Sequence, residues 1–162
     1  VNFRTNSFMG RLRAYAVLGC CPYSILDETD RLDPIDAGAA AYVALAKTPE
    51  CCRLFHATNS DSIPMANLIR MMNEAGVKVE FVEEDAFAAA LDAAMKDPLN
   101  AQVLQPLLAY GQSGEDARVP TPDVNRYTTH VLARMGFFWS STSDDYVKAF
   151  VKALKGLRFF KE

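Results

Sequence analysis

Long apolar runs and surplus positive charge are both missing from this sequence of 162 residues. No stretch of about 18 uncharged apolar residues occurs, and no basic stretch leads into an apolar segment, so neither a membrane span nor a signal peptide is predicted. Lys and Arg number 17 against 20 Asp and Glu, a net charge of −3, which excludes the basic surface of proteins that coat nucleic acid. We therefore expect a cytoplasmic protein with neither a nucleic-acid nor a membrane partner.

Residues that bind metals are scarce and badly spaced. The four cysteines form two adjacent pairs, Cys20–Cys21 and Cys51–Cys52, whereas zinc sites space their ligands two to four residues apart. We expect small buried side chains at the edges of elements, with a redox role as the alternative. His56 and His130 lie far apart in apolar-rich segments and are expected to be packed and hydrogen-bonded. The sequence predicts no metal site.

Motifs that hold a nucleotide or carry out catalysis are also absent. Neither G-x-G-x-x-G nor G-x-x-x-x-G-K-[ST] occurs, so the chain has no recognisable loop for a pyrophosphate. G-x-S-x-G and H-E-x-x-H are missing as well. No tyrosine is followed four residues later by lysine, the spacing that sets an ammonium beside a phenol on a helix. We assign no catalytic, cofactor-binding or metal-binding residue in this chain.

The residues present predict a folded, mostly helical domain. Half of them are apolar and 23% are charged, enough for one core over residues 1–162. Capping residues and apolar spacing predict helices at 6–19, 36–47, 64–75, 84–95, 99–110 and 123–135, and from Ser143 onward. Strands are expected at 52–57 and 77–82. Two strands make a poor sheet, so either the sheet is small or the rest of it lies elsewhere.

Three short segments, in their order along the chain, carry a family resemblance. They read NFRTNSF at 2–8, LDPID at 32–36 and LFHATN at 54–59. Together they resemble the C-terminal portion of an extended short-chain dehydrogenase/reductase, and more narrowly the thioester reductase domains of nonribosomal peptide synthetases. In that family a Pro-(Ile/Val)-Asp segment starts a helix packed on the nucleotide-binding sheet, and an F-H-x-x-N segment is the last strand of that sheet.

The resemblance implies a helix-dominated α/β fold, namely the C-terminal substrate-binding part of a Rossmann-type extended short-chain reductase with few strands of its own. The N-terminal cofactor-binding part would be absent from residues 1–162. The parent protein would use NADPH to reduce an acyl thioester held on the phosphopantetheine arm of a carrier domain. By analogy Arg4, Asn6 and Phe8 would lie near the substrate, and the surface that faces the missing sheet would be exposed or covered by self-association.

Two other functions are compatible with the sequence. One is the corresponding part of a sugar-nucleotide epimerase or dehydratase, although no arginine cluster suited to a nucleotide diphosphate is seen. The other is a non-catalytic helical interaction module. On the last helix Lys148, Lys152 and Lys155 recur at helical spacing, which indicates either a docking stripe for an acidic carrier domain or an ordinary solvated face.

Overall fold

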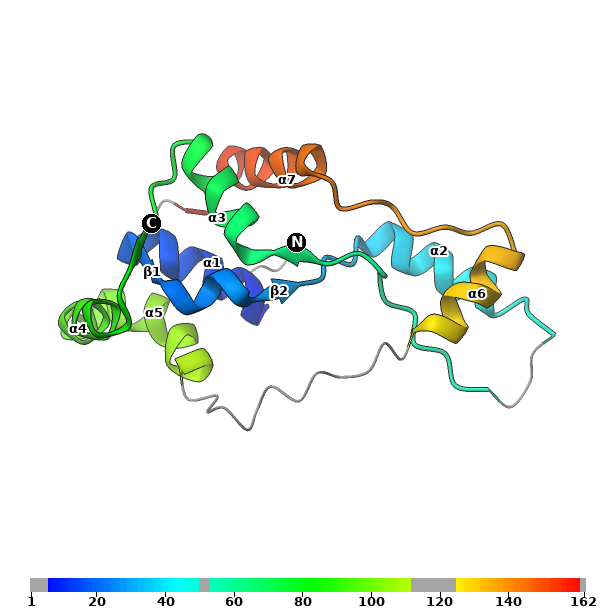
Figure 1. The fold of residues 1–162 in the computed structure, drawn as a ribbon, viewed down its shortest axis with the longest axis horizontal. Helices are drawn as coiled ribbons and strands as arrows, with labels where there is room; N and C mark the ends of the chain where they lie inside the picture. Colours follow the sequence, from blue (N-terminus) through cyan, green and yellow to red (C-terminus); the bar gives the residue numbers. More distant parts are fainter. Residues whose placement is uncertain (1–5, 50–52, 112–124, 161–162) are drawn as a thin grey trace. The chain divides into compact units, whose positions relative to one another are not determined.

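The structure is a computed structural model that describes residues 6–49, 53–111 and 125–160, and helices dominate it (Figure 1). In chain order the elements are α1 (Ser7–Leu18), β1 (Cys20–Pro22), the 3-10 helix η1 (Tyr23–Asp27), β2 (Thr29–Asp30), α2 (Ile35–Leu45), β3 (Ile63–Pro64), α3 (Met65–Glu74), β4 (Glu80–Val82), α4 (Glu84–Ala94), α5 (Pro98–Gly111), α6 (Arg126–Arg134) and α7 (Asp144–Gly156). The expected helix-dominated α/β class is confirmed. No helix among the described residues is long and apolar enough to cross a bilayer.

The chain divides into two compact units. The first unit comprises Val1–Glu28, Pro64–Val119 and Asp144–Glu162, and the second comprises Thr29–Ile63 and Pro120–Ser143. The first unit therefore holds α1, β1, η1, α3, β4, α4, α5 and α7, whereas the second holds β2, α2 and α6.

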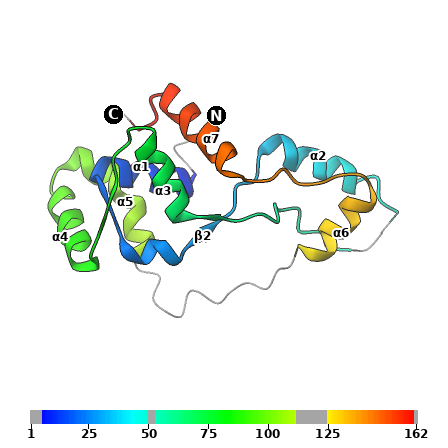
Figure 2. The same ribbon diagram turned by 45° about the horizontal axis from the view of Figure 1, so that its top comes forward.

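The first unit is built around α1 and α3. Helix α1 packs against α5, and α3 packs against α7, which lies beside it in both ribbon views (Figures 1 and 2). The side chains that close this core are almost fully buried: Leu12, Ile25, Met65, Leu68, Ile69, Met71, Met72, Leu104, Val147 and Val151. Helices α3 and α7 each turn an apolar stripe inward and a charged face outward, as the 3.6-residue period of their sequences predicts.

Local signals set the bounds of α1. The Asn6 side chain accepts a hydrogen bond of 2.9 Å from the Met9 backbone N–H and so caps the first turn. At the other end Gly19 adopts φ 78°, and its N–H bonds to the Tyr15 carbonyl oxygen. That left-handed conformation suits glycine, which has no Cβ. The predicted helix is confirmed at both ends.

A parallel strand pair follows directly from α1. Strand β1 pairs with β4 in the register Cys20 with Glu80 and Pro22 with Val82. The sequence predicts the second strand, over 77–82, but not the first. Before β4 the chain is fixed by Asn73, whose side-chain amide donates to the Val79 carbonyl oxygen at 2.9 Å and accepts from the Val79 N–H at 2.8 Å.

The second unit has a much smaller core. Ala41 and Leu45 of α2 pack with Val131 and Leu132 of α6, and partly buried side chains that include Trp139 surround them. Strand β2 pairs with β3 in a two-stranded sheet. The expected strand over 52–57 is wrong for its described part, because residues 53–57 form no strand. Side-chain hydrogen bonds hold this segment in place of a sheet ladder.

Candidate functional site

The residues predicted to lie near substrate gather at the start of α1, and two of the three are described. Asn6 is exposed and Phe8 is half-buried, while Arg4 lies outside the described residues. The cap uses only the Oδ1 atom of Asn6, and no described residue takes up its Nδ2 donors. The exposed Asn6 amide could hydrogen-bond a carbonyl group, and the half-buried Phe8 ring two residues later could contact an alkyl chain.

A buried charged cluster anchors α1 behind this segment. The Arg11 side chain is 5% exposed and forms an ion pair of 2.6 Å with Glu28, whose side chain is 20% exposed. Arg11 Nε also donates a 3.0 Å hydrogen bond to the Tyr15 hydroxyl oxygen. The Glu28 carbonyl oxygen in turn accepts from the Met65 N–H at 2.9 Å, which links α1 and η1 to the start of α3. This cluster was not predicted, since the sequence does not show which carboxylate would pair with an arginine on an apolar helix.

Burial keeps the groups around this cluster neutral and therefore does not suit them for proton transfer. Burial raises the pKa of Tyr15 to about 12, against which the neighbouring Arg11 acts only in part. Burial likewise raises the pKa of the Cys21 thiol to about 12 and raises the pKa of Cys20. A reductase tyrosine that donates a proton near pH 7 needs the opposite shift. Cys21 is a buried strand residue, as expected, whereas Cys20 is partly exposed, and a raised pKa disfavours the reactive thiolate at both. Cys51 and Cys52 lie outside the described residues.

The carboxyl ends of β1 and β4 lie at one edge, where parallel sheets bind dinucleotides. Here that edge is acidic. Glu83, Glu84 and Asp85 follow β4, and Glu84 Oε1 accepts a 2.9 Å hydrogen bond from the Ser24 N–H at the start of η1. A carboxylate thus takes the backbone donor that a phosphate would need, and like charge repels a pyrophosphate. The residues of this edge do not fit NADPH.

The segment with the F-H-x-x-N pattern forms the hub of the second unit. Asn59 is fully buried, and its Nδ2 donates to the carbonyl oxygens of Leu32 at 3.1 Å and Ser140 at 3.3 Å. Its Oδ1 accepts from the Asp61 N–H at 3.1 Å, and its backbone N–H donates to Asp33 Oδ1. All hydrogen-bonding groups of this side chain are therefore used, and three loops meet on it.

Two residues at the start of α6 brace the same segment. Asn125 Nδ2 donates to the Thr58 carbonyl oxygen at 3.0 Å, and the Thr128 hydroxyl accepts from the His56 N–H at 2.8 Å. Both Asn125 and Thr128 are buried. The histidines themselves are exposed rather than packed, so that expectation is wrong, and the described residues include no group of three or more potential metal ligands.

The second unit also contains a small cavity of about 110 Å³. It is lined by Thr48, Pro49, Val131, Arg134 and Met135. Pockets that bind organic ligands measure roughly 300–1,000 Å³. This cavity is therefore too small for an acyl-pantetheine arm.

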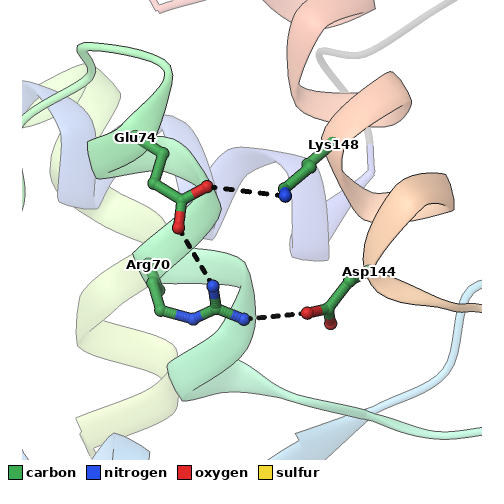
Figure 3. Close-up of polar contacts among 4 residues, drawn as sticks. All are labelled: Arg70, Glu74, Asp144 and Lys148. Atoms are coloured by element: carbon green, nitrogen blue, oxygen red, sulfur yellow. Dashed lines mark hydrogen bonds and ion pairs between the residues drawn. The ribbon is translucent and has the colours of Figure 1, made fainter.

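An exposed ion-pair network joins α3 and α7 (Figure 3). Arg70 donates to Glu74 and to Asp144, each at 3.0 Å, and Lys148 approaches Glu74 at 3.9 Å. The side chains are about half exposed, so solvent screens each pair and its contribution to stability is small. The ion pairs therefore fix the orientation of α7 on α3, whereas the buried apolar side chains of the two helices supply most of the stability of their contact.

The lysine stripe of α7 is partly engaged within the chain. Lys155 Nζ donates to the Ala75 carbonyl oxygen at the end of α3, and Lys148 belongs to the network above. These contacts favour a solvated structural face over a docking stripe, because two of the three ammonium groups already have partners in the first unit.

The comparisons with known proteins give the fold of the chain. No protein-family model matches the sequence, and no curated protein matches it. Among solved structures, a thiolation-reductase di-domain from an archaeal non-ribosomal peptide synthetase matches 99% of this chain with a TM-score of 0.79 and 23% identity. The terminal R domain of the myxalamid PKS-NRPS biosynthetic pathway matches 96% of this chain with a TM-score of 0.72 and 18% identity.

These matches confirm the expected resemblance at the level of the fold. The chain has the fold of a part of these reductase domains, and it spans 33% of the first matching chain and 40% of the second. Identities below 25% carry the fold alone, so activity, cofactor and partner are proposals. Neither match tests Arg4, Asn6 and Phe8 as substrate-binding residues, and these assignments stay predictions, as does the cytoplasmic location.

Proposed function

We propose that the chain is the substrate-binding C-terminal part of an NADPH-dependent thioester reductase, which releases an acyl or peptidyl chain from a carrier domain. The observation that carries the proposal is the fold match over nearly the whole chain to two reductase domains of nonribosomal and hybrid synthetases. The carrier domain with its phosphopantetheine arm is the proposed partner, in line with the thiolation domain in the first of these structures.

In this proposal the described residues orient the substrate and do not bind NADPH. The acidic edge beyond β1 and β4 does not fit a pyrophosphate, so NADPH would be bound by residues outside this chain. The start of α1 would instead orient the substrate, with Asn6 Nδ2 as a donor to a pantetheine amide and Phe8 as an apolar wall. Arg4, just before this helix, would contribute a positive charge.

The proposal is tested by calorimetric titration with NADPH. The 162-residue chain is expected not to bind, whereas a longer chain that includes the residues encoded upstream is expected to bind NADPH and to reduce an acyl-pantetheine thioester. Tight binding of NADPH by residues 1–162 alone contradicts the proposal. Failure of the longer chain to reduce any acyl thioester contradicts it as well.

The role of Asn6 is tested separately in the longer chain. Asn6→Asp keeps an equally good helix cap but removes the Nδ2 donors, so KM for the acyl-pantetheine is expected to rise several-fold with an unchanged unfolding midpoint. Asn100→Asp, at a half-buried position on α5 in the same unit, is the matched control. Equal KM values for the two variants would remove Asn6 from the substrate site.

A further inference from the structure

Two residues that are unfavourable within a helix meet where α1 packs on α5. Gly10 lies within α1, and Pro106 lies in the interior of α5. Glycine and proline are the two residues that least favour a helix, the first because of its backbone freedom and the second because it lacks an N–H and its ring is bulky. Helix preference therefore explains neither residue, and their mutual contact is the feature that the structure offers instead.

The close approach of the two helices requires glycine at position 10. A Cβ built on Gly10 would lie 3.1 Å from Pro106 Cγ and 3.6 Å from Pro106 Cβ. The first of these distances is shorter than a relaxed contact between two carbon atoms, which is about 3.5–4.0 Å. At Gly156 in α7, by contrast, a Cβ would meet no atom of the described residues within 4 Å. Packing thus demands a glycine in α1 but not at the end of α7.

The ring of Pro106 makes this contact rigid. A long, flexible side chain would turn aside to admit a methyl group, but the pyrrolidine ring is closed on the backbone and moves only when α5 moves. Leu104 and Leu107, on either side of Pro106 in the sequence, are almost fully buried and hold this part of α5 in the core. The separation of α1 and α5 is therefore set by the ring of Pro106 against the backbone of Gly10.

Gly10 is joined directly to Asn6, the residue assigned to the substrate. The Gly10 N–H donates a 2.9 Å hydrogen bond to the Asn6 carbonyl oxygen, and the Met9 N–H donates a 2.9 Å hydrogen bond to Asn6 Oδ1. These two bonds hold both the backbone and the side chain of Asn6 on the first turn of α1. A displacement of Gly10 away from α5 therefore moves Asn6 and its Nδ2 donors with it.

We propose that Gly10 and Pro106 are positioning residues, which set the place from which the Asn6 amide binds the pantetheine arm of an acyl thioester. The inference rests on the proposed function, since it concerns the same end of α1. It adds that the separation of α1 and α5, and not the helix cap alone, determines the affinity for the arm. A displaced Asn6 lengthens its hydrogen bond to a pantetheine amide but leaves the reacting thioester carbon untouched, so KM changes and kcat does not.

The test compares variants of the longer chain, with an acyl-pantetheine thioester and NADPH as substrates. Gly10→Ala is expected to raise KM for the thioester about threefold to tenfold, the loss of part or all of one hydrogen bond. The values of kcat and of KM for NADPH are expected to stay as in the parent chain. Gly156→Ala, the same substitution in another helix of the first unit, is the matched control and is expected to change none of the three.

A compensating substitution distinguishes this contact from a general loss of stability. Pro106→Ala removes Cγ and keeps Cβ, which lies at the ordinary contact distance of 3.6 Å from a methyl group at position 10. Pro106→Ala by itself leaves a gap beside Gly10 and is expected to raise KM. Gly10→Ala combined with Pro106→Ala is expected to return KM to the parent value, because the new methyl group fills the space of the ring.

A second combination tests whether Gly10 acts through Asn6. Asn6→Asp removes the Nδ2 donors, so adding Gly10→Ala to it is expected to raise KM no further. Urea unfolding and circular dichroism check that each variant is folded under the assay conditions. An equal rise in KM with and without Asn6→Asp would show that Gly10 acts by another route and would overturn the inference.

Two other results also overturn it. One is an unchanged KM for Gly10→Ala in a longer chain that reduces the thioester. The other is a double variant in which the effects of Gly10→Ala and Pro106→Ala simply combine. A longer parent chain that reduces no acyl thioester contradicts the proposed function itself, so failure of that proposal and failure of the inference are distinguishable.

Discussion

Replacing Asn59 tests the claim that side-chain hydrogen bonds hold the second unit together. Asn59→Ala removes two donor bonds, to Leu32 and Ser140, and one acceptor bond, from the Asp61 N–H. Each buried hydrogen bond contributes about 1 kcal/mol net, and water replaces part of the loss at the exposed Ser140. We expect the free energy of unfolding of this unit to fall by about 2–3 kcal/mol.

The assay is urea unfolding followed by tryptophan fluorescence. Trp139 is the single tryptophan and packs against the core of the second unit, so its emission reports on that unit. With an m-value of about 1.5 kcal/mol/M, the midpoint is expected to fall by about 1.5 M. Asn100→Ala, which loses one weak 3.4 Å contact on the surface of α5, is expected to move it by less than about 0.3 M.

A second variant at the same position separates hydrogen bonding from shape. Asn59→Asp keeps the size of the side chain but turns an acceptor toward two carbonyl oxygens and adds a charge beside Asp33. Burial and the neighbouring carboxylate raise the pKa of the introduced carboxyl group, so the destabilisation grows as pH rises above about 4. The reasoning is refuted if Asn59→Ala and Asn100→Ala shift the midpoint equally, or if Asn59→Asp is as stable as the parent chain at pH 7.

Two further predictions concern the first unit. Arg11→Met removes the 2.6 Å ion pair with Glu28 and is expected to lower the free energy of unfolding by about 2–3 kcal/mol, whereas Arg70→Met, in the exposed network, is expected to change it much less. Chemical unfolding monitored by circular dichroism compares the two variants, and equal effects would contradict the burial argument. Because the folded-state pKa values of Cys21 and Tyr15 are both about 12, above their ordinary values, the unfolded chain loses these protons first and stability is expected to fall as pH rises from about 9 to 12. Cys21→Ala should flatten the lower part of that decline in pH-dependent thermal unfolding, and an unchanged profile would show that the thiol is not buried as described.

The helices could be predicted from the sequence because their signals are local. Asn6 caps α1 by accepting a hydrogen bond from the N–H of Met9, three residues further along the chain. Gly19 and Gly76 end their helices with φ of 78° and 82°. The first turn of α4 carries Glu84 and Asp85 at the positive end of its dipole. None of these interactions depends on a distant part of the chain.

The strands could not be predicted in the same way. β1 consists of Cys20–Pro22, three residues without an alternating pattern, and it becomes a strand only because β4 lies beside it, some 60 residues further along the chain. Conversely, residues 53–57 have the apolar and aromatic composition of a buried strand, yet the side chains of Thr128 and Asn125 bond to the His56 N–H and the Thr58 carbonyl oxygen instead. Whether each segment becomes a strand is thus decided by whether another strand lies beside it, and this cannot be read from the local sequence.

The candidate site likewise combines features that the local sequence predicts with features that depend on distant residues. The start of α1 was predicted from its resemblance to a family segment, and the structure explains how Asn6 can cap the helix and still present donors outward. The partner of Arg11 was not predictable, because Glu28 lies in a segment without periodicity that reads as an ordinary solvated loop. The carboxylate cluster at Glu83, Glu84 and Asp85 is visible in the sequence. Its position at the dinucleotide-binding edge could not be predicted, because that position depends on the pairing of β1 with β4.

The two units are stabilised in different ways. The first unit is stabilised mainly by packed side chains from five of its helices and by a buried ion pair. The second has a core cluster of only four buried apolar residues, depends on polar braces such as Asn59, and leaves Ile35, Tyr42 and Val43 of α2 exposed. Because its core cluster is so small, the second unit depends on these polar braces more than the first unit depends on its exposed ion pairs. The loss of Asn59 is therefore expected to destabilise the second unit more than the loss of Arg70 destabilises the first.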